Sequence, residues 1–365
     1  MVSFTPTEDQ KLLLETLNRY AMSDVRPIAH EHDEASEPAE SVVKTGWQMG
    51  LVASAIPEEL GGFGEMSAVT GVMAAEELAF GDLSVAMHVM TPSLFAYPLV
   101  LFGTAEQRES MLEMFLDEEV APATSALLEP GIQFDPYNLK TTASVDGDTV
   151  TISGTKAYVP LAETSQHILV YAKNSESGDV EAYIVGKDSD GVVIEKREML
   201  LGVRALPTYR VNFNDVKAEA SAKLGGAVGI NYQLLLDRMN LGLTAMAVGV
   251  ARGAYEYARE YAKEREQFGR AIAQNQSIAF MIAEMAIEID ATRLMVWEAA
   301  DKLDRGEDVT KETYIARRYA NKMVLTVTDG GVQTLGGYGF IREYPAERWL
   351  RNGRGFTTFD GLAIV

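Results

Sequence analysis

Two segments in the last third of the sequence combine glycine with a cationic or amide side chain, and their backbone amides could approach a ligand closely. Arg265 is followed by Phe268 and a glycine, and Gln333 is followed by Gly336 and Gly337. Glycine lets backbone N–H groups approach a ligand closely. Each segment alone also fits a helix C-cap or a tight turn, so neither segment alone predicts a binding site.

Other frequent catalytic motifs are absent from the sequence. It contains no P-loop, no dinucleotide-binding G-x-G-x-x-G and no G-x-S-x-G. It also contains no cysteine, which excludes disulfides, thiolate metal ligands and thiol nucleophiles. His30 and His32 would point to different faces of a helix, and His88 and His167 stand alone. No metal site is predicted.

The composition is that of a globular protein with a large acidic excess. Among 365 residues, 53 are Asp or Glu and 32 are Lys or Arg, which gives a formal charge of −21. This charge argues against a nucleic-acid partner or an anionic membrane surface. The longest apolar stretch, residues 241–251, is too short to span a bilayer, and the N-terminus lacks the basic and apolar regions of a signal peptide. We therefore expect a cytoplasmic protein without a membrane partner.

The elements that must position the candidate residues form three zones, which we predict as domains 1–120, 121–222 and 223–365. Apolar residues at helical spacing mark the first and the last zone. A capping box of Thr7 and Gln10 opens the first helix, and Pro27 should end or kink it. Further helices are expected at residues 39–51, 67–80, 84–102, 104–116, 232–265, 278–303 and 311–335.

The middle zone changes period and indicates a compact β-domain inserted between the two helical zones. Short runs rich in β-branched and aromatic residues are separated by turn sequences such as Asp146-Gly147-Asp148. The predicted strands lie at residues 149–152, 167–171, 181–185 and 209–213.

Taken in order, the segments resemble those of the acyl-CoA dehydrogenase family of flavoproteins over nearly the whole chain. The resemblance is carried by residues 56–64, Glu129-Pro130 with Asp135, Gly154 with Lys156, residues 265–269 and residues 333–339. It implies a mainly α fold with an inserted β-domain: an N-terminal helical domain, a β-barrel-like middle domain and a C-terminal four-helix bundle. It also implies assembly as a homo-oligomer, a dimer or a tetramer.

The resemblance further implies an FAD cofactor between the β-domain and the C-terminal helices. Arg265 would pair with the pyrophosphate of the FAD in a neighbouring subunit, and Phe268 would reach the same cofactor. The glycines after Gln333 would meet its nucleotide half. The predicted cofactor-binding residues are Leu128, Phe134, Tyr158, Pro160, Arg265, Phe268, Gln276, Gln333, Gly336 and Gly337.

The family reaction is the α,β-dehydrogenation of an acyl-CoA thioester. A carboxylate removes the α-proton, and the β-hydrogen leaves as hydride to flavin N5. The base is usually a glutamate in a Y-E-G-T segment, and the matching segment here is Phe359-Asp360-Gly361-Leu362. Asp360 would therefore be the catalytic base, with its carboxylate retracted by one methylene, about 1.5 Å. Electrons would pass to an electron-transfer flavoprotein.

Family position also predicts contacts with the acyl-CoA substrate, from Met90, Phe95, Asp237, Asn240 and Gly361. Met90 and Phe95 would line the acyl end of the pocket, although both are equally at home in a core. Asp237 would lie near the acyl-CoA or be a solvated acid at the start of a helix. Met239 and Asn240 offer no second base where some relatives carry a glutamate and an arginine.

Several positions depart from the family pattern. Leu128 lacks a hydroxyl that would contact the flavin, Phe134 replaces a serine, and Pro160 has neither a hydroxyl nor an N–H near N5. Three interpretations stay open: a dehydrogenase with Asp360 as base, an FAD-binding subunit of a hetero-oligomer whose paralogous partner carries the glutamate, or a non-catalytic relative. A carboxylate at position 360 favours the first.

Overall fold

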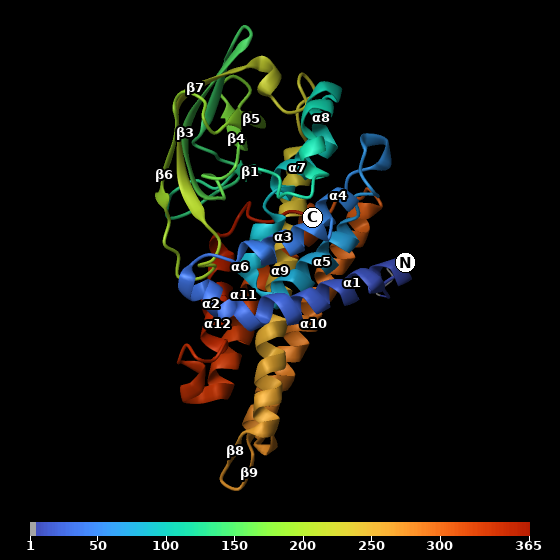
Figure 1. Cartoon of the computed structure of the whole chain (residues 1–365), viewed down its shortest axis with the longest axis vertical. Helices are drawn as coiled ribbons and strands as arrows, with labels where there is room; N and C mark the ends of the chain where they lie inside the picture. The colour runs from blue at the N-terminus through green and yellow to red at the C-terminus, as the bar shows by residue number, and fades with distance from the viewer. Residues whose placement is uncertain (1–4) are drawn as a thin grey trace.

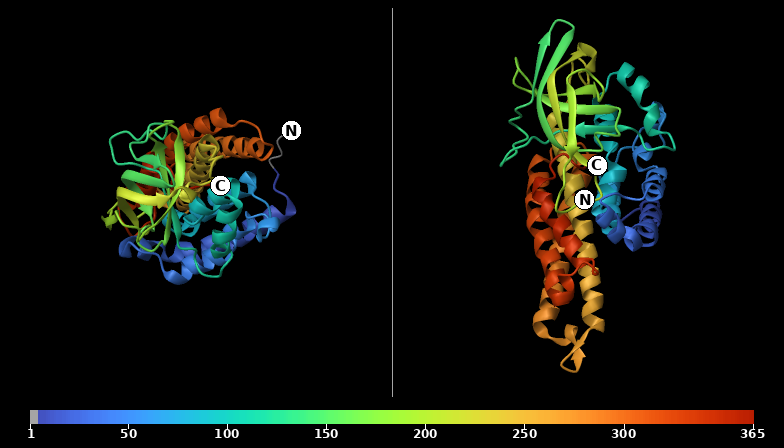
Figure 2. Two further views of the ribbon diagram at one scale, coloured as in Figure 1. Left: turned by 90° about the horizontal axis from the view of Figure 1, so that it is seen from above. Right: turned by 60° about the vertical axis from the view of Figure 1, so that its left-hand side comes forward.

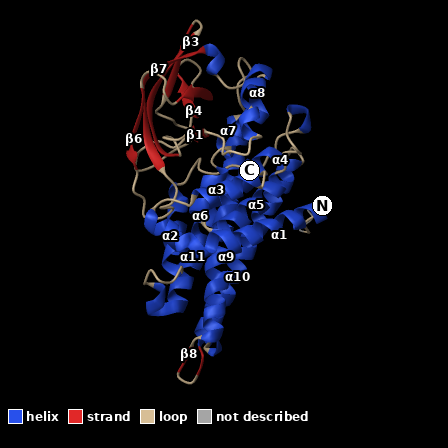
Figure 3. Cartoon of the chain, in the orientation of Figure 1, coloured by secondary structure: helices blue, strands red, loops and turns tan. Residues whose placement is uncertain are grey.

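The computed structural model of the protein describes residues 5–365, which form a helical N-terminal part, a β-sheet and a long helical C-terminal part (Figure 1 and Figure 3). This is the predicted fold class. The first four residues, which belong to the segment without signal-peptide features, lie outside the described residues. The β-sheet stands at one end of the long axis, and the tips of two C-terminal helices stand at the other.

The N-terminal part begins with the predicted capping box. Thr7 Oγ1 accepts a hydrogen bond from Gln10 N–H at 3.2 Å, and Thr7 N–H donates to Gln10 Oε1 at 2.9 Å. Around Pro27 the first helix gives way to short π and 3₁₀ turns, as its missing N–H predicts. The helices are α1 (Glu8–Tyr20), α2 (Ala29–Ala35), α3 (Glu40–Gln48), α4 (Leu51–Ser54), α5 (Ala68–Gly81), α6 (Leu83–Met90), α7 (Ser93–Phe102) and α8 (Ala105–Met111).

Two of the predicted helices are divided in the structure. The stretch 84–102 consists of α6 and α7, which are separated at Pro92 because proline has no N–H for the helical ladder. The stretch 39–51 is interrupted at Gly50, whose φ of +69° ends α3 before α4 begins.

The middle part is one curled sheet of seven strands in the order β1-β4-β2-β3-β7-β6, and β5 pairs with β4. The strands are β1 (Ala123–Ala126), β2 (Thr142–Asp146), β3 (Thr149–Pro160), β4 (His167–Asn174), β5 (Val180–Gly186), β6 (Val192–Arg197) and β7 (Thr208–Glu219). The four predicted runs are confirmed within β3, β4, β5 and β7. The sequence analysis did not predict β1, β2 and β6. Of these, β1 and β2 consist mostly of Ala, Ser and Thr and carry little apolar periodicity.

The C-terminal part is built on one long central helix. Its elements are α9 (Tyr232–Glu264), β8 (Glu266–Gln267), β9 (Arg270–Ala271), α10 (Gln276–Asp304), α11 (Thr310–Leu335) and α12 (Ala346–Gly355). Figure 2 shows α9 and α10 running past the N-terminal part to the β8–β9 hairpin. Small residues allow α9 to pack closely, since a Cβ on Gly249 would lie 2.2 Å from the Glu76 carbonyl oxygen of α5.

Two stretches, Leu83–Phe102 and Tyr232–Glu264, are long and apolar enough to cross a membrane by length and composition alone. In the structure, 83% and 89% of the most apolar 18-residue segments of these two stretches are buried in the interior of the protein. This burial is typical of the core helices of globular proteins, which can be equally long and apolar.

Candidate active site and cofactor-binding surfaces

The loop after α12 brings Asp360 against the β-domain. Gly361 adopts φ of +79°, and a Cβ on it would lie 2.9 Å from the Leu127 Cβ at the end of β1. A side chain at position 361 would therefore be both strained and obstructed. The close approach places Asp360 beside the segment that carries Leu128, so the predicted base and one predicted flavin-facing residue are brought together.

The Asp360 carboxylate is partly enclosed and has one cation near it within residues 5–365. Its side chain is 36% exposed, and its Oδ1 lies 3.9 Å from Arg317 Nη2 of α11. Burial raises the pKa of Asp360 above that of a free aspartate, and the Arg317 charge partly opposes this rise. The group is thus a stronger base than an exposed aspartate.

A buried ion pair fixes the neighbouring segment to the sheet. Lys156 of β3 is fully buried, and its Nζ donates to Glu129 Oε1 and to the Leu127 carbonyl, both at 3.0 Å. The Glu129 carboxylate also accepts the N–H groups of Lys140 and Thr141 at 2.7 and 2.8 Å. These bonds set the path of the chain through Leu128.

One predicted flavin-facing residue, Tyr158, borders a small hollow between β3 and the loop after α12. The hollow has a volume of about 190 Å³, and its lining includes Tyr158, Gly355 and Phe359. Tyr158 adopts φ of +52°, which is uncommon for a bulky residue, and its N–H donates to Glu198 Oε2 at 2.9 Å. The strained backbone directs an aromatic side chain toward the Asp360 loop.

Three other predicted cofactor residues in this region offer no side-chain donor. Leu128 and Pro160 are buried, and Phe134 is partly buried against an apolar cluster. The Pro160 carbonyl accepts a hydrogen bond from Thr124 Oγ1 at 2.7 Å. Any polar contact to a ligand at these positions must therefore come from the backbone.

A second set of predicted cofactor residues lines a different hollow, at the far end of α9. Arg265, Phe268, Gly336 and Gly337 contribute to its lining, and its volume is about 550 Å³. A Cβ on either glycine would meet no heavy atom within 4 Å, so both backbones face open space. Arg265 has no acidic partner within residues 5–365; its guanidinium carbon lies 5.3 Å from the ring centre of Tyr338. A free guanidinium beside uncrowded glycine backbone suits a phosphate-bearing ligand.

The remaining members of this set stand at the edge of the same hollow. Gln276 is the exposed first residue of α10, between Asn275 and Ser277, which line the hollow. Gln333 is exposed one residue before Thr334, which also lines it. Both amides are therefore available to a ligand there.

The hairpin tip beside Arg265 exposes an aromatic ring. Phe268 is completely exposed, and Phe268 and Gly269 have φ of +55° and +77° at the turn between β8 and β9. Two consecutive positive φ values are the geometry of a tight hairpin turn, which a phenylalanine adopts at a cost. An exposed aromatic side chain held in a strained turn is a feature of contact surfaces.

The two sets of cofactor residues do not meet within one chain. The hollows at Tyr158 and at Arg265 share no lining residue. Gly242 packs against Ala363 near the Asp360 loop, and about 35 Å of helix, at 1.5 Å per residue, separates it from Arg265. Figure 1 shows the β8–β9 hairpin and the β-domain at opposite ends of the molecule.

The predicted substrate residues do not share one pocket: one lines a hollow, one lies in the core and one is half-buried on a helix. Met90 lines a hollow of about 420 Å³ that also includes Tyr97 and Val365. Phe95 is a core residue, fully buried with its ring centre 6.0 Å from that of Phe115, so its packing does not support a substrate contact. Asn240 is half-buried on α9.

Asp237 is neither solvated nor free, contrary to one of the two interpretations from sequence. Its carboxylate is buried and accepts hydrogen bonds from Thr313 at 2.7 Å, Gln233 at 3.1 Å and Thr310 at 3.2 Å. Burial raises its pKa, and these donors oppose the rise. The bonds tie α9 to the start of α11, which is a structural role.

The residues after Asp360 run into the core, a feature that the sequence analysis missed. Residues 361–365 are buried, and the Val365 carbonyl accepts a hydrogen bond from Arg238 Nη1 at 2.7 Å. They pack on glycines: a Cβ on Gly71 would lie 2.8 Å from Val365 Cβ, and one on Gly242 would lie 3.0 Å from Ile364 N. The segment leads from Asp360 to the hollow that Met90 lines.

Arg317 is the other functional candidate that the sequence analysis missed. The buried positions of α11 include Thr313, Ala316, Ala320 and Val324, and Arg317 falls on the same face. The helical spacing of the apolar residues in the sequence already places position 317 on the buried face of this helix. Because arginine is rarely buried without a partner, its presence there could have indicated a functional residue.

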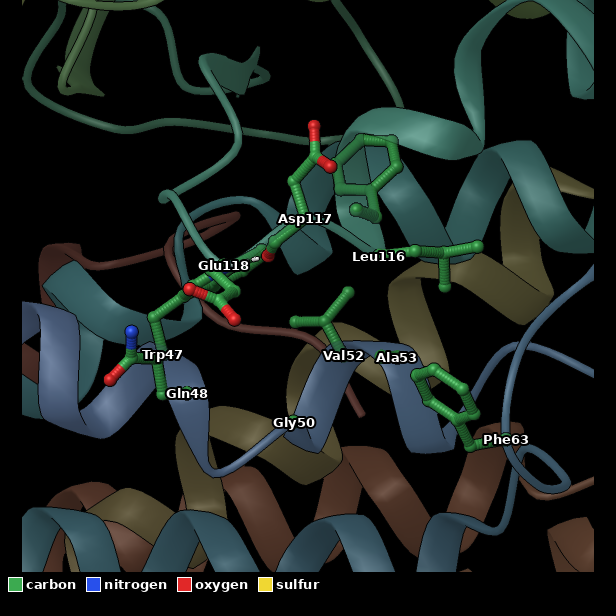
Figure 4. A pocket seen from close by; sticks show the side chains of 10 residues that line it. Trp47, Gln48, Gly50, Val52, Ala53, Phe63, Leu116, Asp117 and Glu118 are labelled. Carbon is green, nitrogen blue, oxygen red and sulfur yellow. Dashed lines mark hydrogen bonds between the residues drawn. The ribbon is translucent and has the colours of Figure 1, made fainter.

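A further hollow lies between α3, α4 and the turn after α8, and it contains none of the predicted site residues (Figure 4). Trp47, Phe63, Asp117 and Glu118 are part of its lining. Two carboxylates make it unsuitable for an anionic cofactor or CoA.

Comparison with known proteins places the chain in a defined group. Sequence models of the acyl-CoA dehydrogenase N-terminal, middle and C-terminal domains match residues 7–119, 124–216 and 228–363. The chain is 34% identical over 366 residues to subunit CarC of the caffeyl-CoA reductase–Etf complex of Acetobacterium woodii, covering 98% of this chain and 96% of that one.

Two further relatives extend the comparison. The chain is 32% identical over 373 residues to the mitochondrial short-chain specific acyl-CoA dehydrogenase of Bos taurus, covering 98% and 88% of the two chains. Among solved structures, butyryl-CoA dehydrogenase of Megasphaera elsdenii superimposes with a TM-score of 0.90 at 29% identity, covering 98% of this chain and 96% of that one.

Proposed function

The chain belongs to the acyl-CoA dehydrogenase family, and we propose that it catalyses the FAD-dependent α,β-dehydrogenation of an acyl-CoA thioester, with Asp360 as the base. The position of Asp360 carries this proposal. Its loop touches Leu127 through Gly361 and borders the hollow of Tyr158 through Phe359. A carboxylate in this place adjoins the surface on which a flavin ring would lie.

The side chains fit FAD in two halves. Tyr158 offers an aromatic surface to the flavin ring. Arg265 offers a guanidinium to the phosphates, and Gly336 and Gly337 leave room for a close approach of the nucleotide half. When bound, FAD supplies the hydride acceptor of the reaction.

The chain's own contribution is a positioned and partly dry base. Asp360 takes the proton from the α-carbon, and burial raises its pKa toward the working pH, which strengthens it as a proton acceptor. Phe359 and the buried residues 361–365 keep water from one side of the loop. The thioester must lie between Asp360 and the flavin surface for this transfer.

The proposal is tested by the visible spectrum of the purified protein under anaerobic titration with a panel of acyl-CoAs. We expect a flavin spectrum that bleaches with one class of thioester. A flavin spectrum that no thioester changes would instead support the FAD-binding partner subunit. Absence of bound flavin even after addition of FAD would contradict the enzyme assignment.

We also propose that two copies of the chain complete each FAD site. Three observations support this: the separate locations of the Tyr158 and Arg265 hollows, the exposed Phe268, and an apolar stripe on α10. The stripe consists of Phe280, Ile287 and Leu294, which lie seven residues apart on one helix face and are 58%, 65% and 47% exposed. Such a surface is typical of contacts between subunits.

A mixture of two inactive variants tests the shared site. Arg265→Glu repels the pyrophosphate, and Asp360→Asn removes the base. Co-expression of the two should restore about half of the activity per pair of chains, since one site then has both residues intact. Activity is measured on hybrids isolated through two different affinity tags. No recovery in confirmed hybrids would place each FAD site within a single chain.

The buried segment after Asp360 favours a small acyl group. Residues 361–365 fill the space toward the hollow of Met90, so a long acyl chain must displace well-packed side chains, which is costly. We expect butyryl-CoA to reduce the flavin faster than palmitoyl-CoA in stopped-flow measurements. Equal or faster reduction by palmitoyl-CoA would show that this segment does not limit the acyl site.

We propose an electron-transfer flavoprotein as the electron acceptor and the cytoplasm as the location. The first is supported by the relative in Acetobacterium woodii, which is a subunit of an Etf complex. The second rests on the sequence features alone.

A further inference from the structure

Arg317 lies beside the proposed base but makes few of the bonds open to a guanidinium. Its side chain is 7% exposed. Nη1 donates to Asn321 Oδ1 at 2.8 Å, and Nη2 donates to the Phe356 carbonyl. Nε is buried without a hydrogen-bond partner within residues 5–365. A buried arginine with an unpaired N–H is expensive for the fold.

The contact with Asp360 is electrostatic. At 3.9 Å, the separation of Arg317 Nη2 from Asp360 Oδ1 is too long for a hydrogen bond. Arg317 therefore holds neither carboxylate oxygen in a bidentate pair, and it does not occupy the oxygen that would accept a substrate proton. The positive charge still acts over this distance, because screening by water is weak in the interior.

Other charges near the loop do not replace this contact. Glu129, on the adjacent segment, is already paired with Lys156. Arg354 of α12 is exposed to solvent. The residues after Asp360 are apolar, and Leu127 packs against Gly361. Arg317 of α11 is thus the charged group that faces Asp360 within residues 5–365.

We propose that Arg317 is the positioning residue of the base: it anchors the loop through the Phe356 carbonyl, and its buried charge keeps Asp360 ionised when substrate closes the site. This inference rests on the proposed dehydrogenation with Asp360 as base. A bound thioester removes water from Asp360 and so favours its neutral form. A cation behind the carboxylate, out of contact with solvent, counters that effect without occupying the proton-accepting oxygens.

The sign of the pH effect follows directly. Burial raises the pKa of Asp360 and Arg317 lowers it. Loss of the Arg317 charge therefore raises the pKa further, and the acidic limb of kcat/KM moves to higher pH. We expect a shift of about one pH unit, the lower end of the effect of an arginine beside an aspartate. Well above both pKa values, the variant and the parent should have similar rates.

The experiment compares Arg317→Gln, Arg317→Lys and Arg318→Met with the parent FAD-loaded protein. The Arg317→Gln variant has a neutral amide donor on a shorter side chain, whereas Arg317→Lys retains the charge. Arg318 is the exposed neighbour on α11 and serves as the matched control. For each protein, kcat/KM and the exchange of the substrate α-proton into D2O are measured across pH. Bound flavin and thermal denaturation verify folding.

The inference predicts that the acidic limb of the kcat/KM profile moves to higher pH in Arg317→Gln. In Arg317→Lys and Arg318→Met, this limb should lie at nearly the same pH as in the parent. An unchanged limb in a folded Arg317→Gln protein would overturn it, as would an equal shift in both Arg317 variants, which would assign the effect to contact and not to charge. If Arg317→Gln does not fold, Arg317→Met supplies the uncharged variant, and its acidic limb is compared with that of Arg317→Lys. Failure of the underlying function is recognised separately, because Asp360→Asn would then remain active.

Discussion

Asp360→Asn is expected to lower the rate of flavin reduction by acyl-CoA about 10²- to 10⁴-fold while FAD stays bound. The amide has nearly the same shape as the carboxylate but cannot accept the α-proton, and this factor is the usual contribution of a general base. The Asp360 loop contacts Leu127 through Gly361, whereas the residues proposed to hold the FAD phosphates line the separate hollow of Arg265. The measurement is single-turnover bleaching of the flavin in a stopped-flow instrument.

Two comparisons make this result specific to the base. Asp190→Asn makes the same change on an exposed loop between β5 and β6 and should leave the rate unchanged. Asp360→Glu returns the missing methylene and should retain a measurable rate, because a carboxylate is still present. Near-normal bleaching by Asp360→Asn would remove Asp360 from the chemistry and favour a partner chain as the source of the base.

The predictable part of the structure is the part determined by local patterns. Helical spacing, the Thr7 capping box and the β-rich runs specify three successive parts of the chain, and the structure has them. The errors lie where one residue overrides a pattern: Pro92 divides a helix and Gly50 ends another. Local propensity does not show β1, because its four small residues become a strand only through pairing with β4.

The sequence predicted those residues of the candidate site that belong to recognisable motifs. It did not predict the residues that reach the site only through the packing of distant segments. The sequence segments indicate Asp360, Tyr158 and Arg265, but the distance between their hollows depends on how α9 is oriented. Arg317 becomes relevant only when α11 lies against the loop of Asp360. The burial of residues 361–365 likewise depends on the absence of side chains at Gly71 and Gly242, which lie far away in sequence.

Lys156→Met should be the most destabilising single change in the β-domain. It leaves the Glu129 carboxylate buried without its cation, and the Leu127 carbonyl without a donor. Removal of one member of a buried pair costs about 3–5 kcal/mol. This is a large fraction of the stability of a domain. The free energy of unfolding is measured by urea denaturation followed through tryptophan fluorescence, with FAD in excess.

The double variant Lys156→Met with Glu129→Gln separates the two sources of this loss. The neutral amide at position 129 keeps an acceptor oxygen for one of the two N–H groups, of Lys140 or of Thr141, and no longer leaves a buried charge unpaired. The double variant should therefore be more stable than Lys156→Met alone, since an uncompensated buried charge is the larger penalty. An exposed control, Lys196→Met in β6, should change stability little. If the single and double variants are equally destabilised, the lost methylene packing and the Leu127 contact account for the effect, and the segment through Leu128 is not held by charge.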